Sequence, residues 1–334
     1  MAKKRIKALG LISGGLDSFL ALKLIKRQGI ETAGVCFQNP FIDYKKNDIL
    51  VMIRREARNT GFYFLCRPLR ERYLKVIKTP KHGYGKNMNP CIDCRIYMLK
   101  AAKRIMKNIG ADFLFTGEVV GQRPMSQKKK SLMLVEKESG LEGKLLRPLS
   151  AKLLPATIAE KKGWVEREKL MAIEGRQRGL QLELAKEWGI KYYGQPAGGC
   201  LLTDPNFSRR LKDLLNSGDF ELSNINLLKA GRHFRIDKHS KLIVGRDESD
   251  NLRMRNMLKK GDIAFETLNL PGPFAIGRGD FTQKEIKFSA GIIARYTSRQ
   301  EPVIVGYRRV PDEPCREISS RPLEEEKIEN KRIS

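Results

Sequence analysis

Nothing in the sequence would place the chain in or across a membrane. Its apolar segments, such as residues 8–12 and 303–305, are far shorter than the roughly 20 residues that a membrane-spanning helix needs. Residues 1–7 are not followed by the long apolar segment of a secretory signal. We therefore expect a chain that binds no membrane and stays in the cytoplasm.

Histidines are also scarce, and acidic residues are fewer than basic ones. The three histidines, His82, His233 and His239, do not have the spacing of paired zinc ligands, which makes zinc the weakest metal assignment. The 38 acidic residues are outnumbered by 65 Lys and Arg, which leaves a formal net charge of +27. Such a surplus favours a polyanionic partner over a merely solvated basic surface.

The remaining composition is that of a folded protein. Of the 334 residues, 41% are hydrophobic and 31% charged, whereas disordered chains contain fewer apolar residues. At roughly 100–200 residues per domain, this length predicts two domains. No internal repeat is visible in the sequence.

The first part of the chain alternates between strand-like and helix-like segments. Apolar strands alternate with segments of helical periodicity that end at Gly29 and Gly61. This order predicts an α/β domain with a parallel sheet over residues 1–215. The expected strands are 6–12, 31–37, 62–69, 111–116 and 132–135, and the expected helices are 17–28, 47–59, 92–109 and two within 164–189 that are broken near Gly175.

A smaller α+β domain is expected over residues 216–310, where short strands dominate. Residues 311–334 carry many charges, and we expect a charged flexible tail there. The expected strands of the second domain are 233–236, 242–244, 264–266, 274–276 and 302–307, and its expected helices are 248–259 and 282–297.

A glycine-rich loop, Ser13-Gly14-Gly15-Leu16-Asp17-Ser18, separates the first strand from the first helix. Its two glycines let the backbone approach an anion, and the helix N-terminus adds a partial positive charge. Ordinary capping by Asp17 and Ser18 is the alternative, but it does not account for the paired glycines. Because the loop is neither G-x-x-x-x-G-K-[ST] nor G-x-G-x-x-G, kinase-type phosphoryl transfer and dinucleotide binding are disfavoured.

Three cysteines form a second group of chemical interest. Cys91 and Cys94 make a C-x-x-C at a loop-to-helix junction, where the helix dipole is expected to lower the thiol pKa. Cys200 follows two glycines in a later loop. The three thiols are consistent with an iron–sulfur site, with a thiol and persulfide pair that leaves the third cysteine unused, with a zinc site that lacks a fourth ligand, or with a structural role. Of the other cysteines, Cys36 and Cys66 are expected in the core and Cys315 in the tail.

The S-G-G-x-D-S sequence of residues 13–18 resembles the PP-loop of the ATP pyrophosphatase superfamily. That resemblance implies an adenine nucleotide alpha hydrolase-like fold, cleavage of ATP between its α and β phosphates, and attachment of AMP to a carbonyl oxygen. It also implies a site for pyrophosphate and Mg²⁺. The residues of that site would be Ser13, Gly14, Gly15, Asp17 and Ser18.

Further motifs resemble the tRNA thiouridine synthases. Residues 116–122, T-G-E-V-V-G-Q, with Ser126-Gln127 and the L-R-P-L of residues 146–149, are similar to the 4-thiouridine synthases. The N-P-C of residues 89–91 is shared with the tRNA 2-thiouridylases. The resemblance spans about residues 6–205 and implies an ATP-dependent tRNA sulfurtransferase that makes 4-thiouridine, with 2-thiouridine as the alternative.

The resemblance also assigns roles to individual residues. Cys91, Cys94, Cys200 and Asp17 would be catalytic, and the three cysteines would ligate a [4Fe-4S] cluster. If they hold no cluster, Cys200 would carry a persulfide that Cys91 or Cys94 resolves. Gly117 and Gln122 join the ATP site.

RNA capture is expected to come from the C-terminal part of the chain, because no segment before Ser13 matches the THUMP domain that 4-thiouridine synthases normally carry. Segments 231–236, 243–246, 270–273 and 294–298 follow one another in an order that resembles the NFACT-R RNA-binding domain. Arginines alternate there with Phe234, Phe274 and Tyr296, a mixture that suits phosphate contact and base stacking, unless the aromatics are core residues.

The expected RNA-binding residues lie on both domains. They are Lys100, Lys103, Arg104, Lys107, Lys128, Lys129, Lys130, Arg232, Arg235 and Arg246. The expected partners are tRNA and a sulfur donor, either inorganic sulfide or a cysteine desulfurase system, with a homodimer as a candidate assembly. A non-catalytic RNA- or ribosome-binding factor with a nucleotide-sensing loop is the alternative function.

Overall fold

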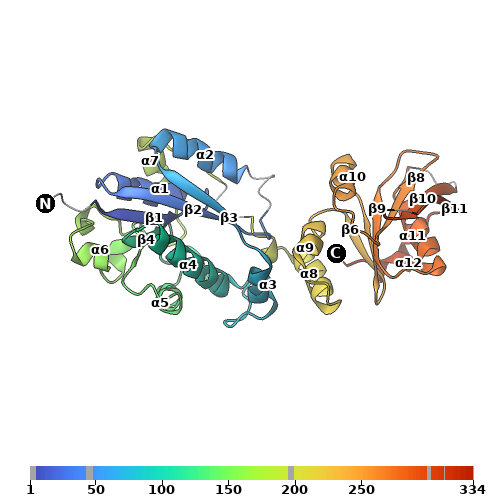
Figure 1. Cartoon of the computed structure of the whole chain (residues 1–334), viewed down its shortest axis with the longest axis horizontal. Coiled ribbons are helices and arrows are strands. Elements are labelled where there is room, and N and C mark those ends of the chain that lie inside the picture. Colours follow the sequence, from blue (N-terminus) through green and yellow to red (C-terminus); the bar gives the residue numbers. More distant parts are fainter. Residues whose placement is uncertain (1–4, 43–47, 195–198, 299–301, 312, 334) are drawn as a thin grey trace. The chain divides into compact units, whose positions relative to one another are not determined.

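The structure is a computed structural model that describes the chain except residues 1–4, 43–47, 195–198, 299–301, 312 and 334 (Figure 1). It divides into two compact units, Met1–Leu201 and Leu202–Ser334. We expected the division near residue 215, but helix α8 (Pro205–Asn216) belongs to the second unit. The physical reason is the α8 residue Asp213, which forms ion pairs with Arg235 and Lys241 of that unit.

The first unit contains a five-stranded sheet in the order β3-β2-β1-β4-β5, with every pair of neighbours parallel. The direction of winding reverses between β1 and β4. In open parallel sheets, ligands bind beyond the carboxyl ends of the strands at such a reversal. The strands are β1 (Lys7–Leu11), β2 (Glu31–Gln38), β3 (Tyr63–Pro68), β4 (Phe113–Thr116) and β5 (Leu145–Leu146).

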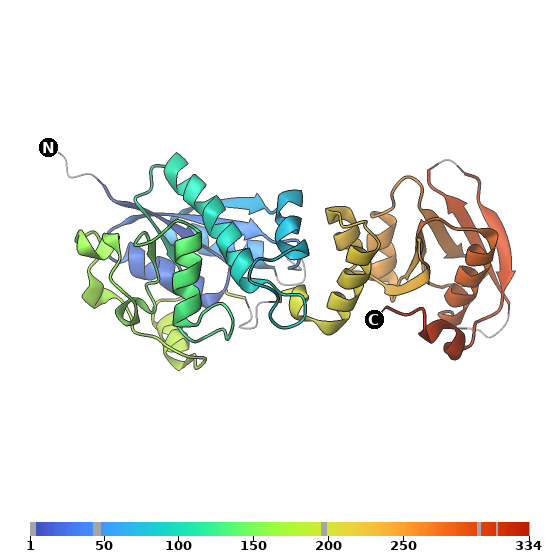
Figure 2. The same cartoon turned by 90° about the horizontal axis from the view of Figure 1, so that it is seen from below.

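Helices cover both faces of this sheet (Figures 1 and 2). Ala8 and Phe115 pack in one apolar cluster with residues of α1 and α7. Leu9 and Leu114 point to the other face and pack with residues of α4 and α5. The helices are α1 (Leu16–Lys26), α2 (Ile49–Thr60), α3 (Glu71–Lys78), α4 (Cys91–Asn108), α5 (Lys129–Glu138), α6 (Ile158–Lys161) and α7 (Gly179–Glu187), with short 3-10 turns at Ala151–Leu153, Arg167–Lys169 and Leu201–Thr203.

Two predicted elements of the first unit are wrong. Residues 132–135, expected as a strand, lie in α5, where Leu132 and Val135 are buried one helical turn apart. Four apolar-rich residues do not distinguish a strand from one helical turn. Residues 164–189 contain one α-helix, α7, and a 3-10 turn instead of two helices.

The second unit contains a six-stranded antiparallel sheet in the order β11-β10-β8-β9-β7-β6. Ile293 of α11 packs on one face with Phe265, and Met254 of α10 packs on the other face with Ile243. The strands are β6 (Arg232–Asp237), β7 (Ser240–Val244), β8 (Ile263–Thr267), β9 (Ala275–Gly279), β10 (Val303–Arg309) and β11 (Arg316–Ser320), and the other helices are α9 (Leu222–Leu227), α10 (Glu248–Arg255), α11 (Gln283–Arg295) and α12 (Glu325–Glu329).

The expectation of a flexible tail over residues 311–334 needs correction. Strand β11 pairs with β10 along its whole length, and Ile328 of α12 is fully buried. The few apolar residues of this charged segment are enough to hold it in the second unit, because they meet the apolar side of α11.

In the described part of the chain, no helix has both the length and the apolar character needed to cross a membrane.

Candidate nucleotide and thiol site

The glycine-rich loop connects β1 to α1 at the winding reversal. Gly15 is the N-cap of α1 and has no side chain to accept from the amides of Leu16 and Asp17, which suits the binding of an anion there. The Ser18 hydroxyl donates to the Gly15 carbonyl oxygen at 2.7 Å instead of capping the helix. Gly14 has a φ of +79°, and a Cβ there would lie 2.8 Å from Cγ2 of Ile49. A larger residue at position 14 would therefore be strained and would displace Ile49.

The segment after β4 forms the opposite wall of this site. A Cβ on Gly117 would lie 2.4 Å from the Asp17 carbonyl carbon, so the T-G-E segment approaches the backbone of α1 as closely as only glycine permits. Gln122 Nε2 donates to Asp17 Oδ2 at 3.1 Å. The structure thus places Gly117 and Gln122 beside the glycine-rich loop, as the motif resemblance predicts.

Asp17 is the acidic group of the loop. Burial raises the pKa of its carboxyl group, and the Gln122 hydrogen bond and the Arg178 charge oppose that rise. Asp17 Oδ1 is buried and has no hydrogen-bond partner among the described residues. Because Mg²⁺ prefers carboxylate oxygen ligands, this unused oxygen suits the ion chemically.

Sequence reasoning missed Arg178. Its Nη2 lies 3.8 Å from Asp17 Oδ1, and its side chain is only 17% exposed. No sequence motif marks Arg178, because it lies close to Gly175, where the sequence predicted only a break between two helices.

The C-x-x-C motif occupies the first turn of α4. Cys91 is the first helical residue, and its Sγ donates to Asn89 Oδ1 at 3.1 Å. The fully buried Tyr73 donates its hydroxyl to Cys94 Sγ at 2.9 Å and accepts a hydrogen bond from Asn39 Nδ2 at 3.1 Å. The Cys94 sulfur therefore lies at the end of a buried chain of hydrogen bonds.

The predicted lowering of the thiol pKa is wrong. Burial raises the pKa of Cys91, although Arg123 and Arg95 oppose the rise. Burial also raises the pKa of Cys94 to about 11, although the Tyr73 hydroxyl opposes that rise. A helix terminus contributes about 0.3–1 kcal/mol, which is less than the cost of removing a thiolate from water.

The loop that carries Cys200 is attached at both ends to the site. Before it, the Gly194 amide donates to the Gly14 carbonyl oxygen at 2.9 Å, and after it the Leu201 amide donates to the Phe41 carbonyl oxygen at 2.9 Å. Residues 196–198 of the P-A-G-G-C sequence lie outside the described residues. Burial and the nearby sulfurs of Cys94 and Cys200 raise the pKa of Tyr73, so both thiols lie near that hydroxyl.

The three thiols have the donor chemistry of an iron–sulfur site, but the structure does not assemble them as ligands. Within the described ranges, no three His, Cys, Asp or Glu side chains are close enough together to hold a metal ion. Cys36 is buried, Cys66 is partly exposed and Cys315 is exposed.

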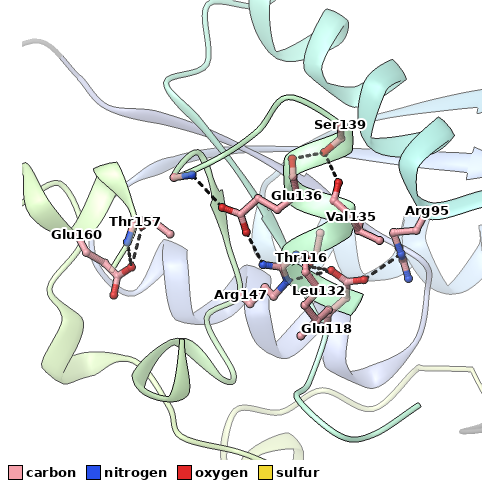
Figure 3. A network of polar contacts seen from close by, with 11 residues as sticks. Arg95, Thr116, Glu118, Leu132, Val135, Glu136, Ser139, Arg147, Thr157 and Glu160 are labelled. Carbon is pink, nitrogen blue, oxygen red and sulfur yellow. Dashed lines mark hydrogen bonds and ion pairs between the residues drawn. The ribbon is translucent and has the colours of Figure 1, made fainter. Parts of the chain in front are cut away.

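A buried charge network ties the motifs of this unit together (Figure 3). Glu118 lies between Arg95 Nε at 3.0 Å and Arg147 Nε at 3.2 Å, and Arg147 Nη1 reaches Glu136 Oε2 at 2.8 Å. Burial alone would raise the pKa of Glu118, but Arg95 and Arg147 lower it below its ordinary value. The network joins the cysteine helix, the T-G-E segment and the L-R-P-L segment.

Most of the basic residues predicted for RNA on the first unit are exposed. Lys100, Arg104 and Lys107 are exposed on α4, and Lys128, Lys129 and Lys130 are exposed where α5 begins. Lys103 differs, because it is only partly exposed and donates to the Gly140 carbonyl oxygen at 2.6 Å.

The three arginines predicted for RNA on the second unit each have an internal partner. The Arg232 guanidinium lies 4.4 Å from the centre of the Tyr296 ring. Arg235 makes two hydrogen bonds to Asp213, at 2.9 and 2.7 Å. Arg246 pairs with Asp250.

The expected stacking surface needs correction for two of its aromatics. Phe234 and Phe274 are buried in the apolar clusters on the two faces of the sheet. Only Tyr296 of the three is partly exposed. Arg232 and Phe234 are two residues apart in β6 and share one face of the strand, where both contact the Tyr296 ring.

Two family models match separate parts of the chain. The model described as "Thiamine biosynthesis protein (ThiI)" matches residues 4–152. The model described as "NFACT protein RNA binding domain" matches residues 231–332. The second match includes most of the segment that we had expected to be a tail.

Curated relatives resemble less than half of the chain. The probable tRNA sulfurtransferases of Alkaliphilus metalliredigens and Thermococcus kodakarensis are 32% and 30% identical over 148 and 152 residues, 43% of this chain and 36% of each relative. The tRNA-specific 2-thiouridylase MnmA of Syntrophotalea carbinolica is 30% identical over 125 residues, 35% of this chain and 36% of the relative. The chain thus spans about a third of the length of these relatives.

Two solved structures are also similar to the chain. A 4-thiouridine synthetase in complex with RNA and ATP has a TM-score of 0.38 and 21% identity, covering 66% of this chain and 53% of that one. The U34-tRNA thiolase NcsA of Methanococcus maripaludis, with its [4Fe-4S] cluster, has a TM-score of 0.35 and 18% identity, covering 68% and 72%. Two separate segments of the chain therefore each match a family model, residues 4–152 that of the thiamine biosynthesis protein ThiI and residues 231–332 that of the NFACT RNA-binding domain.

Proposed function

We propose that this chain is an ATP-dependent tRNA sulfurtransferase that makes 4-thiouridine. In the proposed reaction the uracil carbonyl oxygen attacks the α-phosphate of ATP, and pyrophosphate leaves. A sulfur nucleophile then adds to the uracil carbon that carries this oxygen, and AMP leaves with the oxygen. The observation that carries the proposal is the hydrogen bond from Gly194 to Gly14, which attaches the loop of Cys200 directly to the phosphate loop.

The residues of the first unit divide into three groups in this proposal. The loop amides of residues 13–18 and the N-terminus of α1 would bind the pyrophosphate, and Asp17 would bind Mg²⁺. The thiols of Cys91, Cys94 and Cys200 lie on the sulfur-handling side. The exposed lysines of α4 and α5 and the second unit would bind tRNA, with sulfide or a cysteine desulfurase system as the sulfur source.

A [4Fe-4S] cluster on the three cysteines is the finer part of the proposal. Since the described thiols are not gathered as metal ligands, we assign the cluster no step in the reaction. Iron and sulfide content of the anaerobically purified wild-type protein and Cys200→Ala variant tests it. Loss of iron in the variant supports a three-cysteine cluster, and unchanged iron content contradicts it. No iron in either protein favours the persulfide route.

The proposed function is tested by mass spectrometry of nucleosides from bulk tRNA. A deletion strain is complemented with the wild-type gene, Asp17→Ala or Cys91→Ala. We expect 4-thiouridine to disappear in the deletion strain and to return only with the wild-type protein. Loss of 2-thiouridine instead would select the 2-thiouridylase alternative. Unchanged thionucleosides would contradict tRNA thiolation and favour a non-catalytic RNA-binding factor.

A further inference from the structure

Arg178 is a mostly buried cation with one buried donor, Nε, that has no hydrogen-bond partner among the described residues. Its Nη2 lies 3.8 Å from Asp17 Oδ1, which is too long for a hydrogen bond. Arg178 Nε and Asp17 Oδ1 are both buried and have no hydrogen-bond partner among the described residues. A guanidinium removed from water is stabilised only when its donors are satisfied, so the open donor indicates an absent acceptor.

The backbone holds Arg178 at the phosphate loop from two sides. Just before it, the Gly175 amide donates to the Val120 carbonyl oxygen at 2.8 Å, and Glu174 forms a parallel bridge with Val120. Just after it, α7 begins at Gly179 and packs against α1. The backbone of Arg178 therefore lies between a segment attached to the T-G-E wall and a helix that packs against α1.

The groups around this open donor suit a phosphate ligand. The Gln122 amide already donates to Asp17, and α1 presents its N-terminus to the same place. The Arg178 fork adds donors in the planar arrangement that matches two phosphate oxygens. We propose that Arg178 binds the phosphates of the nucleoside triphosphate held by residues 13–18. This inference rests on the proposed use of ATP.

The test measures nucleotide binding by isothermal titration calorimetry on the full chain with Mg²⁺ and without RNA. Arg178→Ala is compared with Arg176→Ala, which removes the same charge from an exposed side chain two residues away. We expect Arg178→Ala to weaken ATP binding about 10- to 100-fold, because a charged hydrogen bond contributes about 1.5–3 kcal/mol. Arg176→Ala should change it less than about twofold.

Adenosine serves as a ligand without phosphates. Its affinity should be the same in the wild-type protein and in Arg178→Ala, whereas a general distortion of the site would weaken adenosine and ATP together. If Arg178→Ala does not fold, Arg178→Lys replaces it, since it keeps the charge but loses the fork, and we expect about 10-fold weaker ATP binding.

ATP affinity of Arg178→Ala within twofold of Arg176→Ala, or an equal loss for adenosine, would overturn the proposal. A wild-type protein that binds ATP through Arg178 but forms no thiouridine would leave this inference standing and reject the proposed function instead.

Discussion

Single side chains set the chemistry of the thiols. The Cys94 sulfur accepts a hydrogen bond from the Tyr73 hydroxyl, which is itself oriented by Asn39. Because that hydrogen bond lowers the pKa of Cys94 from a still higher value, Tyr73 supports the anionic form of the sulfur. Tyr73 is therefore a positioning residue for Cys94.

Tyr73→Phe should slow the alkylation of Cys94 by about 10-fold at pH 8–9, since the rate below the pKa follows the thiolate fraction. The measurement is iodoacetamide labelling of the metal-free protein, read by peptide mass spectrometry, with Cys91 as the internal reference. Tyr97→Phe makes the same chemical change in the ring that packs against Tyr73 and should have no such effect. An unchanged Cys94 rate in Tyr73→Phe would show that the hydroxyl does not support the thiolate.

Arg147 is a buried residue on which the stability of the first unit depends. It is 2% exposed and bonds to Glu118, Glu136 and the Leu132 carbonyl oxygen. Arg147→Met should lower the free energy of unfolding by about 3–5 kcal/mol, because it leaves the buried Glu136 without its arginine and Glu118 with Arg95 alone. Urea unfolding followed by tryptophan fluorescence checks this, since both tryptophans lie in the first unit.

The matched control is the exposed Lys144→Met, which removes the same charge three residues earlier and should change stability by less than about 0.5 kcal/mol. Equal stabilities of the two variants would mean that the buried network contributes nothing specific.

Among the secondary structure elements, β7 carries a lysine in the core of the second unit. Lys241 is 7% exposed and pairs with Asp213 at 2.8 Å, and burial lowers its pKa to about 8. Between about pH 8 and its ordinary value of 10.5, the unfolded chain therefore binds more protons at this position than the native one. The contribution of Lys241 to stability must rise with pH across that interval.

We expect the unfolding free energy of the wild-type protein to rise relative to Lys241→Met by up to about 3 kcal/mol between pH 8 and 10.5. Urea unfolding monitored by circular dichroism at several pH values measures this difference. Lys238→Met, at an exposed position, should show no pH-dependent difference from wild type. A constant difference for Lys241→Met would contradict the lowered pKa.

Helix α12 is the other element with a measurable role. Ile328→Ala should destabilise the second unit by about 2–4 kcal/mol, because it removes a fully buried side chain from the core. Hydrogen exchange of the β10 and β11 peptides should become faster in this variant. Exposed Glu326→Ala is the control. Unchanged exchange in Ile328→Ala would support the free tail that the composition had suggested.

The whole molecule carries a formal net charge of +27, and we expect this charge to contribute to RNA binding. Replacing the exposed Lys128, Lys129 and Lys130 with Gln should weaken tRNA binding and make it less dependent on salt. The slope of the logarithm of the binding constant against the logarithm of the salt concentration should become shallower by about 0.7–0.9 for each phosphate that is no longer neutralised. Filter binding over a salt series measures the slope. As a control, changing the exposed Lys161, Lys186 and Lys191 to Gln removes the same charge elsewhere. Equally weakened binding in both triple variants would mean that net charge alone binds tRNA.

The predictions from sequence succeeded where the signal was local. The β1–loop–α1 unit and the α4 helix follow from short apolar segments and their flanking glycines, and the structure contains them. The approach of Gly117 to Asp17 was expected only through motif resemblance, and the long stretch of chain between them contains no sign of it. Arg178 was missed because its importance lies in what surrounds it, not in its neighbours along the chain.

Residue type and short spacing along the chain were enough to establish the order of most strands and helices in the first unit, the glycine-rich loop, the C-x-x-C pair and the excess of positive charge. Folding added what no local pattern carries. It set the reversal of strand order at β1 and β4, the burial that raises the thiol pKa values, the place of Arg178 and the packing of the C-terminal segment. Desolvation and core packing govern those features, and both depend on residues distant in the chain.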